Sequence, residues 1–239
     1  MENSIARYLD HAILKPEMTR IEAIEAIKYG IEHKVRTVCV RPCDVELAVE
    51  LCRGTETDPC VVLGFPHGCV LPEVKAFEAS TYIDLGVKEI DMVVNYGFIR
   101  SGMWEEVERD IRAVSDKTRK AGVLLKVILE TCTLSREEII RATEIAANAG
   151  ADFVKTSTGF HSAGATEEAV KAMVEAAKGR IKVKASGGIR DIETARRFIE
   201  MGCERLGVGY STTPVLLKGE GRSSENYDST SNGGVEPVK

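Results

Sequence analysis

Short apolar runs alternate with longer amphipathic stretches along almost the whole of this 239-residue chain, and this rhythm constrains its fold most strongly. Such alternation is typical of consecutive strand–helix units built around a parallel sheet. The apolar runs predict strands at residues 8–12, 37–40, 60–64, 89–95, 124–130, 153–156, 181–185 and 205–208. Between them the sequence predicts helices at residues 20–33, 44–52, 72–85, 104–121, 136–149, 167–177 and 192–201.

Eight strands in one chain predict the α/β class and a (β/α)8 TIM barrel, as a single domain over residues 1–218. The alternative is an open doubly wound sheet, which usually begins with a glycine-rich phosphate turn after its first strand. Residues 10–16 (DHAILKP) contain no glycine, so the barrel is favoured. Residues 219–239 are rich in serine, glycine and charge, lack apolar periodicity, and are expected to form a flexible C-terminal tail.

Composition bounds the kind of partner that this chain can have. A net charge of −5 gives no broad basic surface for nucleic acid. The seven cysteines are an odd number spread through apolar runs, which indicates reduced thiols rather than a disulfide framework. No apolar run is long enough to span a membrane, and the N-terminus lacks a signal-peptide core. We therefore expect a soluble, cytoplasmic protein that acts on a small molecule and has no nucleic-acid or membrane partner.

Four consecutive predicted strands carry a charged residue where a buried parallel strand should be apolar. These residues are Asp91, Lys126, Lys155 and Lys184. The steps from 91 to 126, 126 to 155 and 155 to 184 are 35, 29 and 29 residues, each about one strand–helix unit. In a barrel the four therefore lie on adjacent strands, about 4.8 Å apart per strand, and converge near the catalytic end if they face the lumen.

This set of charges points to chemistry on an amine. A single buried lysine is explained by reaching a rim or pairing with a carboxylate, but burying four charged groups together is costly without a purpose. A free lysine has a pKa of about 10.4 and is almost fully protonated at pH 7. A neighbouring ammonium and apolar surroundings both lower that pKa and free the amine to form a Schiff base with a carbonyl. The spacing leaves open which lysine attacks.

Glycines follow the last two predicted strands, at the place where barrels of this type often bind phosphate. Gly187 and Gly188 follow the seventh strand, and Gly207 and Gly209 lie at the end of the eighth. Backbone N–H groups in such loops are suitable donors to a phosphate. Together with the lysines, they favour a phosphorylated aldehyde or ketone as substrate.

The chain resembles the deoxyribose-phosphate aldolases, a family of class I aldolases. The resemblance covers about 200 residues, everything but the tail. The matching stretches are YLDHAILKPE (8–17), VCVRP (38–42), LGFPHG (63–68), EIDMVVN (89–95), LKVILET (125–131), DFVKTSTGF (152–160) and VKASGGIR (183–190). The lysine of KTSTGF, followed by KASGG, is specific to this family rather than general to barrels.

The resemblance implies reversible cleavage of 2-deoxy-D-ribose 5-phosphate to D-glyceraldehyde 3-phosphate and acetaldehyde, with no metal and no cofactor. It assigns the Schiff base to Lys155, the neighbouring cation that lowers its pKa to Lys184, and a proton relay through water to Asp91. The substrate-binding residues that it implies are Asp10, Cys39, Lys126, Thr156, Thr158, Gly187, Gly188, Gly207 and Gly209.

One loop departs from the family pattern. The family usually has Gly-x-Ser-Ser after the eighth strand, where this chain has Gly207-Val208-Gly209-Tyr210-Ser211. A tyrosine at the second serine position would narrow or block the phosphate site, or Ser211 would replace the serine after a small shift. Some family members use a C-terminal tyrosine that reaches the site, and Tyr227 is either such a residue or a bystander in the tail.

Three other readings remain. A metal enzyme is disfavoured, because the four histidines lie far apart in the sequence and no CxxC pair is present. A related Schiff-base aldolase or phosphosugar barrel enzyme would keep the lysines and act on a different substrate, even an unphosphorylated one. A non-catalytic paralogue would bind a metabolite only. Barrels of this kind often pair through their outer helices, so a homodimer or other homo-oligomer is expected.

Overall fold

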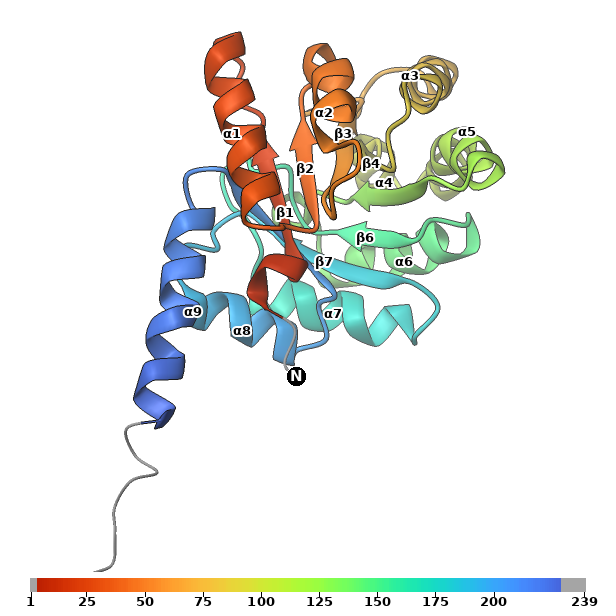
Figure 1. Cartoon of the computed structure of the whole chain (residues 1–239). Coiled ribbons are helices and arrows are strands. Elements are labelled where there is room, and N and C mark those ends of the chain that lie inside the picture. Colours follow the sequence, from red (N-terminus) through yellow and green to blue (C-terminus); the bar gives the residue numbers. More distant parts are fainter. Residues whose placement is uncertain (1–3, 229–239) are drawn as a thin grey trace, which may run out of the picture.

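The computed structural model describes residues 4–228, with side chains as far as Glu220. Within this range, eight parallel strands pair in chain order and close into one barrel, with β8 against β1. The helices lie outside the ring of strands (Figure 1). The predicted (β/α)8 barrel is confirmed, and the open doubly wound sheet is excluded.

The strands are β1 (Leu9–Ile13), β2 (Thr37–Val40), β3 (Asp58–Leu63), β4 (Glu89–Val93), β5 (Leu124–Ile128), β6 (Phe153–Lys155), β7 (Lys182–Ser186) and β8 (Arg205–Gly209). The helices of the described range are α1 (Arg20–Glu32), α2 (Val45–Cys52), α3 (Pro72–Leu85), α4 (Tyr96–Arg100), α5 (Trp104–Ala121), α6 (Arg136–Asn148), α7 (Glu167–Ala177), α8 (Ile192–Glu200) and α9 (Thr213–Asp228). Every predicted strand and helix is present, with bounds within two residues of those expected. Helices α4 and α9 are additional.

Local sequence signals explain where several helices begin and end. Thr19 and Ser135 each form a capping box. The hydroxyl accepts a hydrogen bond from the third helical N–H, and the glutamate carboxylate at that position accepts one from the backbone N–H of the capping residue. Helices α3 and α5 end at Gly86 and Gly122, both in the left-handed conformation that glycine adopts without strain. These caps fix the residues at which the helices begin or end.

The strands have two buried faces of different character. In β4, Ile90 and Met92 belong to the apolar core, whereas Glu89 and Asp91 are buried polar residues. Because successive side chains point to opposite faces, the core residues pack towards the helices and the acidic ones enter the lumen. Lys126 on β5 is likewise fully buried. The barrel lumen is therefore a charged interior within an apolar shell.

The C-terminal part of the chain differs from the expectation of a flexible tail from residue 219. Helix α9 runs through this point to Asp228 and lies beside α8 (Figure 1). Glu220 accepts hydrogen bonds from the Ser4 hydroxyl and from the Ile5 backbone N–H, at 3.0 and 2.7 Å. These contacts fasten α9 to the start of the chain, which composition alone could not indicate. Residues 229–239 and the side chain of Tyr227 lie outside the described part.

Among the helices that the structure describes, none is both long and apolar enough to cross a membrane.

Candidate active site

Two of the predicted lysines meet at one carboxylate oxygen. Lys155 is the last residue of β6, and it is the register partner of Lys184 on β7. The Nζ atom of Lys155 lies 2.8 Å from Asp91 Oδ2, and the Nζ atom of Lys184 lies 2.7 Å from the same oxygen. Residues 64 and 93 positions away from Asp91 in sequence therefore share one acceptor. The structure brings together the three residues expected to carry the chemistry.

The third lysine lies among three carboxylates. Lys126 Nζ is 2.7 Å from Asp91 Oδ1, 2.5 Å from Glu89 Oε2 and 3.3 Å from Asp10 Oδ2. Asp10, on β1, also pairs with Lys184. The ion pairs thus continue around the lumen from β4 and β5 to β1 and β7, and Lys126 stands at their centre.

Arg205 completes this network and was not anticipated from the sequence. Its NH1 group lies 2.6 Å from Asp10 Oδ1 and 2.8 Å from Glu89 Oε2. Glu89 was missed as well, although it precedes Asp91 by two positions and so shares its face of β4. The two-residue spacing from Asp91 was the sequence signal that could have identified Glu89. Arg205 is the first residue of β8, where a charge usually indicates a solvated strand end.

The carboxylates of the network are held in their ionised form. Burial alone would raise the pKa of Asp91, but the three lysine ammonium groups around it outweigh burial and hold that pKa well below its ordinary value. The pKa of Asp10 is also lowered, because Arg205 and Lys126 outweigh the cost of burial. Lys126 and Arg205 likewise lower the pKa of Glu89 against the effect of burial.

Three of the basic groups are held in their protonated form. Burial alone would lower the pKa of Lys184, but the Asp10 and Asp91 carboxylates outweigh it and raise that pKa above its ordinary value. Lys126 follows the same pattern, and its pKa is raised well above the ordinary value. Arg205 also has a raised pKa, because Asp10 and Glu89 outweigh burial.

The charges of this network, which we call the lumen cluster, do not balance when every group is ionised. Three buried carboxylates face four buried basic groups, so one positive charge is in excess; Arg36, 3.8 Å from Glu89 at the edge of the cluster, is balanced by Asp58 at 3.0 Å. With Lys155 as a neutral amine, three anions face three cations. The members of the lumen cluster are Asp10, Glu89, Asp91, Lys126, Lys155, Lys184 and Arg205.

A cavity of about 500 Å³ opens above the cluster at the carboxyl ends of the strands. Most of the predicted site residues line it, both catalytic (Lys155 and Lys184) and substrate-binding (Asp10, Cys39, Thr158, Gly187, Gly188, Gly207 and Gly209). Asp91, Lys126 and Thr156 do not, since each is fully buried beneath the cavity. Lys155 is therefore the cluster amine that combines access to the cavity with a single carboxylate partner.

A family model described as DeoC/LacD family aldolase matches residues 5–211. The chain belongs to this family. A deoxyribose-phosphate aldolase from Geobacillus sp. (strain WCH70) is 44% identical over 227 residues, covering 95% of this chain and all of that protein. The solved structure of an aldolase called QR15 superposes with a TM-score of 0.86 at 39% identity, covering 92% of this chain and 98% of that one. The tetrameric deoxyribose phosphate aldolase from Aeropyrum pernix gives a TM-score of 0.83 at 29% identity, with 92% of each chain covered.

These comparisons confirm the resemblance read from the sequence motifs and the prediction that the chain is an enzyme of the aldolase class. The solved structures that superpose on this chain also support the barrel fold.

The two threonines after β6 have different partners. Thr156 accepts a hydrogen bond from the Ser186 backbone N–H at 3.0 Å and donates to the Ser186 carbonyl at 3.1 Å, so it ties β6 to the end of β7. Thr158 donates its hydroxyl to Glu130. Glu130 is buried and adopts a positive φ of 57°, an uncommon conformation for a residue other than glycine. Sequence reasoning did not single out Glu130, which holds the loop that carries Thr158.

Gly207 makes room for the side chain of Lys184. A Cβ atom at this position would lie 2.5 Å from Ser186 Oγ and 3.1 Å from Lys184 Cε. The absence of a side chain therefore leaves room for Lys184 to extend through the lumen. Gly187 and Gly188 adopt φ values of 80° and 79° and lead from β7 towards α8.

Tyr210 lines the cavity, at the loop that departs from the family pattern. Its backbone N–H donates to the Ala12 carbonyl at 2.9 Å, and its ring lies 5.5 Å from the Nζ atom of Lys15. Lys15 and Arg190 also line the cavity and bring two further positive charges to its rim. The tyrosine therefore stands at the end of the cavity where a phosphate would be expected.

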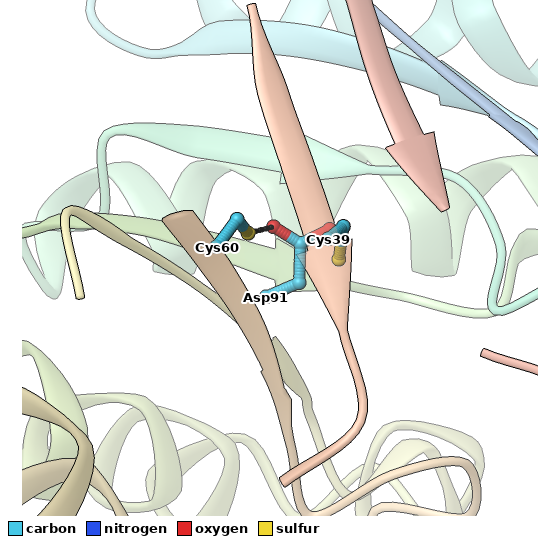
Figure 2. Close-up of side chains that lie close together, drawn as sticks. All are labelled: Cys39, Cys60 and Asp91. Carbon is cyan, nitrogen blue, oxygen red and sulfur yellow. Dashed lines mark hydrogen bonds between the residues drawn. The ribbon is translucent and has the colours of Figure 1, made fainter. Parts of the chain in front are cut away.

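Cys39, Cys60 and Asp91 place three potential metal-ligand atoms within 4.8 Å of one another. Figure 2 shows them projecting from neighbouring strands, with the Cys60 thiol hydrogen-bonded to Asp91. A metal ion would need deprotonated thiols. Burial raises the pKa of Cys60 well above its ordinary value, and Asp91 already accepts from three ammonium groups. The donor set therefore suits the ion-pair network better than a metal ion.

Proposed function

We propose that this protein is a class I aldolase that reversibly cleaves 2-deoxy-D-ribose 5-phosphate to D-glyceraldehyde 3-phosphate and acetaldehyde through a Schiff base on Lys155. The observation that carries the proposal is the position of Lys155 at the floor of the cavity, beside the Lys184 ammonium on a shared Asp91 oxygen. Family membership and the names of the relatives agree with this activity.

Lys155 is the amine best suited to attack. Lys126 contacts three carboxylates and does not reach the cavity, while Lys184 contacts two. Both lysines are needed as cations to balance the acidic groups. Lys155 carries the surplus charge, so its neutral form leaves the lumen cluster balanced. A neutral amine is the form that adds to a carbonyl.

The cleavage reaction then proceeds through a carbinolamine, an iminium ion and an enamine. The Lys155 amine adds to the substrate aldehyde carbon, and loss of water from the carbinolamine gives an iminium ion. The bond between C2 and C3 breaks as its electron pair moves towards the iminium, and the C3 hydroxyl loses its proton to become the aldehyde of the first product. Protonation of the resulting enamine at C2 and hydrolysis release acetaldehyde. Asp91 lies 2.8 Å from Lys155 Nζ beneath the cavity, and we assign it the relay of these protons through a water.

The phosphate end of the substrate is assigned to the glycine loops. Gly187 and Gly188 lead from β7 towards α8, and backbone N–H groups at such a turn attract anions. Lys15 and Arg190 line the same cavity and add positive charge at that end. Tyr210 is the feature that favours a second candidate, a Schiff-base aldolase of the same mechanism that prefers an unphosphorylated sugar.

Trapping with borohydride tests the mechanism. Incubation with acetaldehyde and borohydride should leave a stable adduct on Lys155, and chelators should not prevent it. Lys155→Ala should abolish the adduct, while Lys182→Ala should keep it, because Lys182 is exposed at the start of β7 and pairs with Glu204. An adduct on another lysine would overturn the assignment. A wild-type protein that forms no adduct and releases no acetaldehyde would point to the non-catalytic reading.

We further propose that the protein forms a homo-oligomer and is located in the cytoplasm. Helix α3 and the loop before it expose large apolar side chains, which suits contact with another copy of the chain: Val70, Leu71, Val74 and Phe77. A related aldolase is tetrameric. The seven cysteines are all free within the described residues, which suits the reducing environment of the cytoplasm.

A further inference from the structure

The end of the barrel opposite the candidate active site holds a further cavity. It has a volume of about 660 Å³, within the range typical of sites for small molecules. Its lining comes from residues just before β1 and β2 and from the start of β5, β6, β7 and β8. It therefore opens at the amino ends of the strands, whereas the cavity that contains Lys155 opens at their carboxyl ends. We call it the basal cavity.

The basal cavity is basic, although the whole chain carries a net charge of −5. Five basic residues line it, against two acidic ones. The basic residues are Arg7, Arg36, Arg180, Lys182 and Arg205, and the acidic ones are Asp152 and Glu204. A concave surface lined mainly by one sign of charge concentrates ions of the opposite sign. The lining therefore favours an anion as ligand.

Three of the five basic residues already have carboxylate partners. The pairs are Arg36 with Asp58, Lys182 with Glu204, and Arg205 with Asp10 and Glu89. Asp152 is engaged as well, because its carboxylate accepts a hydrogen bond from the Leu125 backbone N–H at 2.8 Å. In the described part of the chain, neither acidic residue of the lining forms an ion pair with an arginine.

Arg7 and Arg180 carry the positive charge that remains for a ligand. Arg7 donates its NH1 group to three backbone carbonyls, at 3.0 to 3.4 Å, so neutral acceptors hold its side chain in place. Arg180 donates its NH1 group to the side-chain oxygen of Asn148 at 2.9 Å. Among the described side chains, no carboxylate forms an ion pair with either arginine. Each guanidinium therefore has further N–H groups that can donate to an anion.

The rest of the lining is largely aromatic or aliphatic. Tyr8, Leu124 and Ile181 contribute apolar surface, and Phe153 contributes a ring that lies 5.2 Å from the Arg205 guanidinium carbon. Guanidinium groups match the oxygens of a phosphate with parallel, charge-assisted hydrogen bonds. Apolar walls stabilise the carbon skeleton of a ligand that carries such a group. A small organic phosphate satisfies both parts of this lining.

We propose that the basal cavity binds a small organic phosphate. The charge of its phosphate group is balanced by Arg7 and Arg180, and its apolar or aromatic part lies against Tyr8, Leu124 and Ile181. This site is separate from the glycine loops assigned to the phosphate of the substrate, because the two cavities lie at opposite ends of the strands. Binding here needs no reaction at Lys155, so its test is independent of the proposed function.

Calorimetric titration with phenyl phosphate tests the site, because this probe joins a phosphate group to an aromatic ring. Arg180→Gln should weaken binding at the basal cavity about tenfold or more, since charge-assisted hydrogen bonds to the phosphate are lost. Arg7→Gln should have the same effect. Phenyl phosphate should bind about fivefold more tightly than inorganic phosphate, because only the former buries a ring against the apolar walls. Arg190→Gln, which alters the catalytic cavity alone, should leave the basal binding unchanged.

Lys178→Gln is the matched control for Arg180→Gln. Lys178 lies two residues away and carries the same charge, but it pairs with Glu144 and does not line the basal cavity. This variant should bind phenyl phosphate as the wild type does. Titrations that are unaffected by Arg180→Gln, or weakened equally by Lys178→Gln, would overturn the proposal. Equal affinities for phenyl phosphate and inorganic phosphate would likewise rule out an organic phosphate as the ligand.

Discussion

Lys182 and Lys184 show how position on one strand decides what a lysine does. They lie two residues apart on β7, yet Lys182 is exposed and pairs with Glu204, whereas Lys184 is buried between Asp10 and Asp91. The first contact is a surface ion pair of small energetic value. The second supplies a positive charge that the lumen cluster requires.

Lys184→Leu should therefore impair Schiff-base formation. The cluster would keep three carboxylates and only two other cations, so a charged Lys155 would be the form that balances it. We expect the rate of adduct formation with acetaldehyde at pH 7 to fall at least tenfold, with partial recovery at higher pH. Lys182→Leu is the matched control and should keep the wild-type profile. A Lys184→Leu profile lowered equally at every pH would show that this lysine acts by packing alone.

Tyr210 determines how much room remains at the phosphate end. Its side chain lines the cavity beside Lys15, at the position where the family usually has serine. If the ring excludes phosphate, Tyr210→Ser should lower KM for 2-deoxyribose 5-phosphate several-fold more than KM for 2-deoxyribose. Steady-state kinetics with both sugars measure this. Equal effects on the two sugars would show that Tyr210 does not discriminate between them.

At the scale of elements, the strands and most helices could be predicted because each follows a strong local pattern. Helix α4 has only five residues and shows no periodicity. Helix α9 was missed because glycine and charged residues obscure its pattern, and it is stabilised by contacts distant in sequence, such as Glu220 with Ser4. The same limit applies to the site. The strand spacing predicted that Lys155 and Lys184 converge, but the pairing of Glu89 with Arg205 depends on barrel closure.

His11 joins three elements and makes their packing sensitive to pH. On β1, its Nδ1 atom lies 2.7 Å from the Thr213 hydroxyl of α9, and its Nε2 atom lies 3.0 Å from the Ala26 carbonyl of α1. Burial lowers the pKa of His11 to about 4 from 6.5. In the unfolded chain His11 therefore becomes protonated below pH 6.5, whereas in the folded protein it becomes protonated only near pH 4.

The stabilisation from neutral His11 should consequently be complete above pH 6.5 and be lost as the pH falls towards 4. A shift of this size corresponds to about 3 kcal/mol of the free energy of unfolding. Chemical denaturation of the wild type and of His11→Gln across this range measures it. The variant should be less stable at pH 7, and the difference between the two proteins should shrink on acidification. A constant difference would contradict the assignment.

At the scale of the whole molecule, helix α3 and the residues before it expose large apolar side chains to solvent. Phe77 is 74% exposed, Val74 is exposed on the turn before it, and Leu71 is exposed at the residue that precedes the helix. The residues that we propose to be catalytic all come from one chain, so assembly is expected to affect stability more than chemistry. As proposed above, this apolar surface would be covered by a second copy of the chain.

Phe77→Glu should weaken that contact, because a buried unpaired carboxylate is costly at an apolar interface. We expect sedimentation to show the wild type as a multimer of the 26.1 kDa chain and the variant shifted towards the single-chain mass. Ile21→Glu is the matched control, since Ile21 is 69% exposed on α1, away from α3, and should leave the mass unchanged. A wild type that sediments as a single chain at micromolar concentration, or an unaffected Phe77→Glu variant, would show that α3 is not the interface. Retention of adduct formation in the dissociated variant would further show that each barrel contains a complete reactive site.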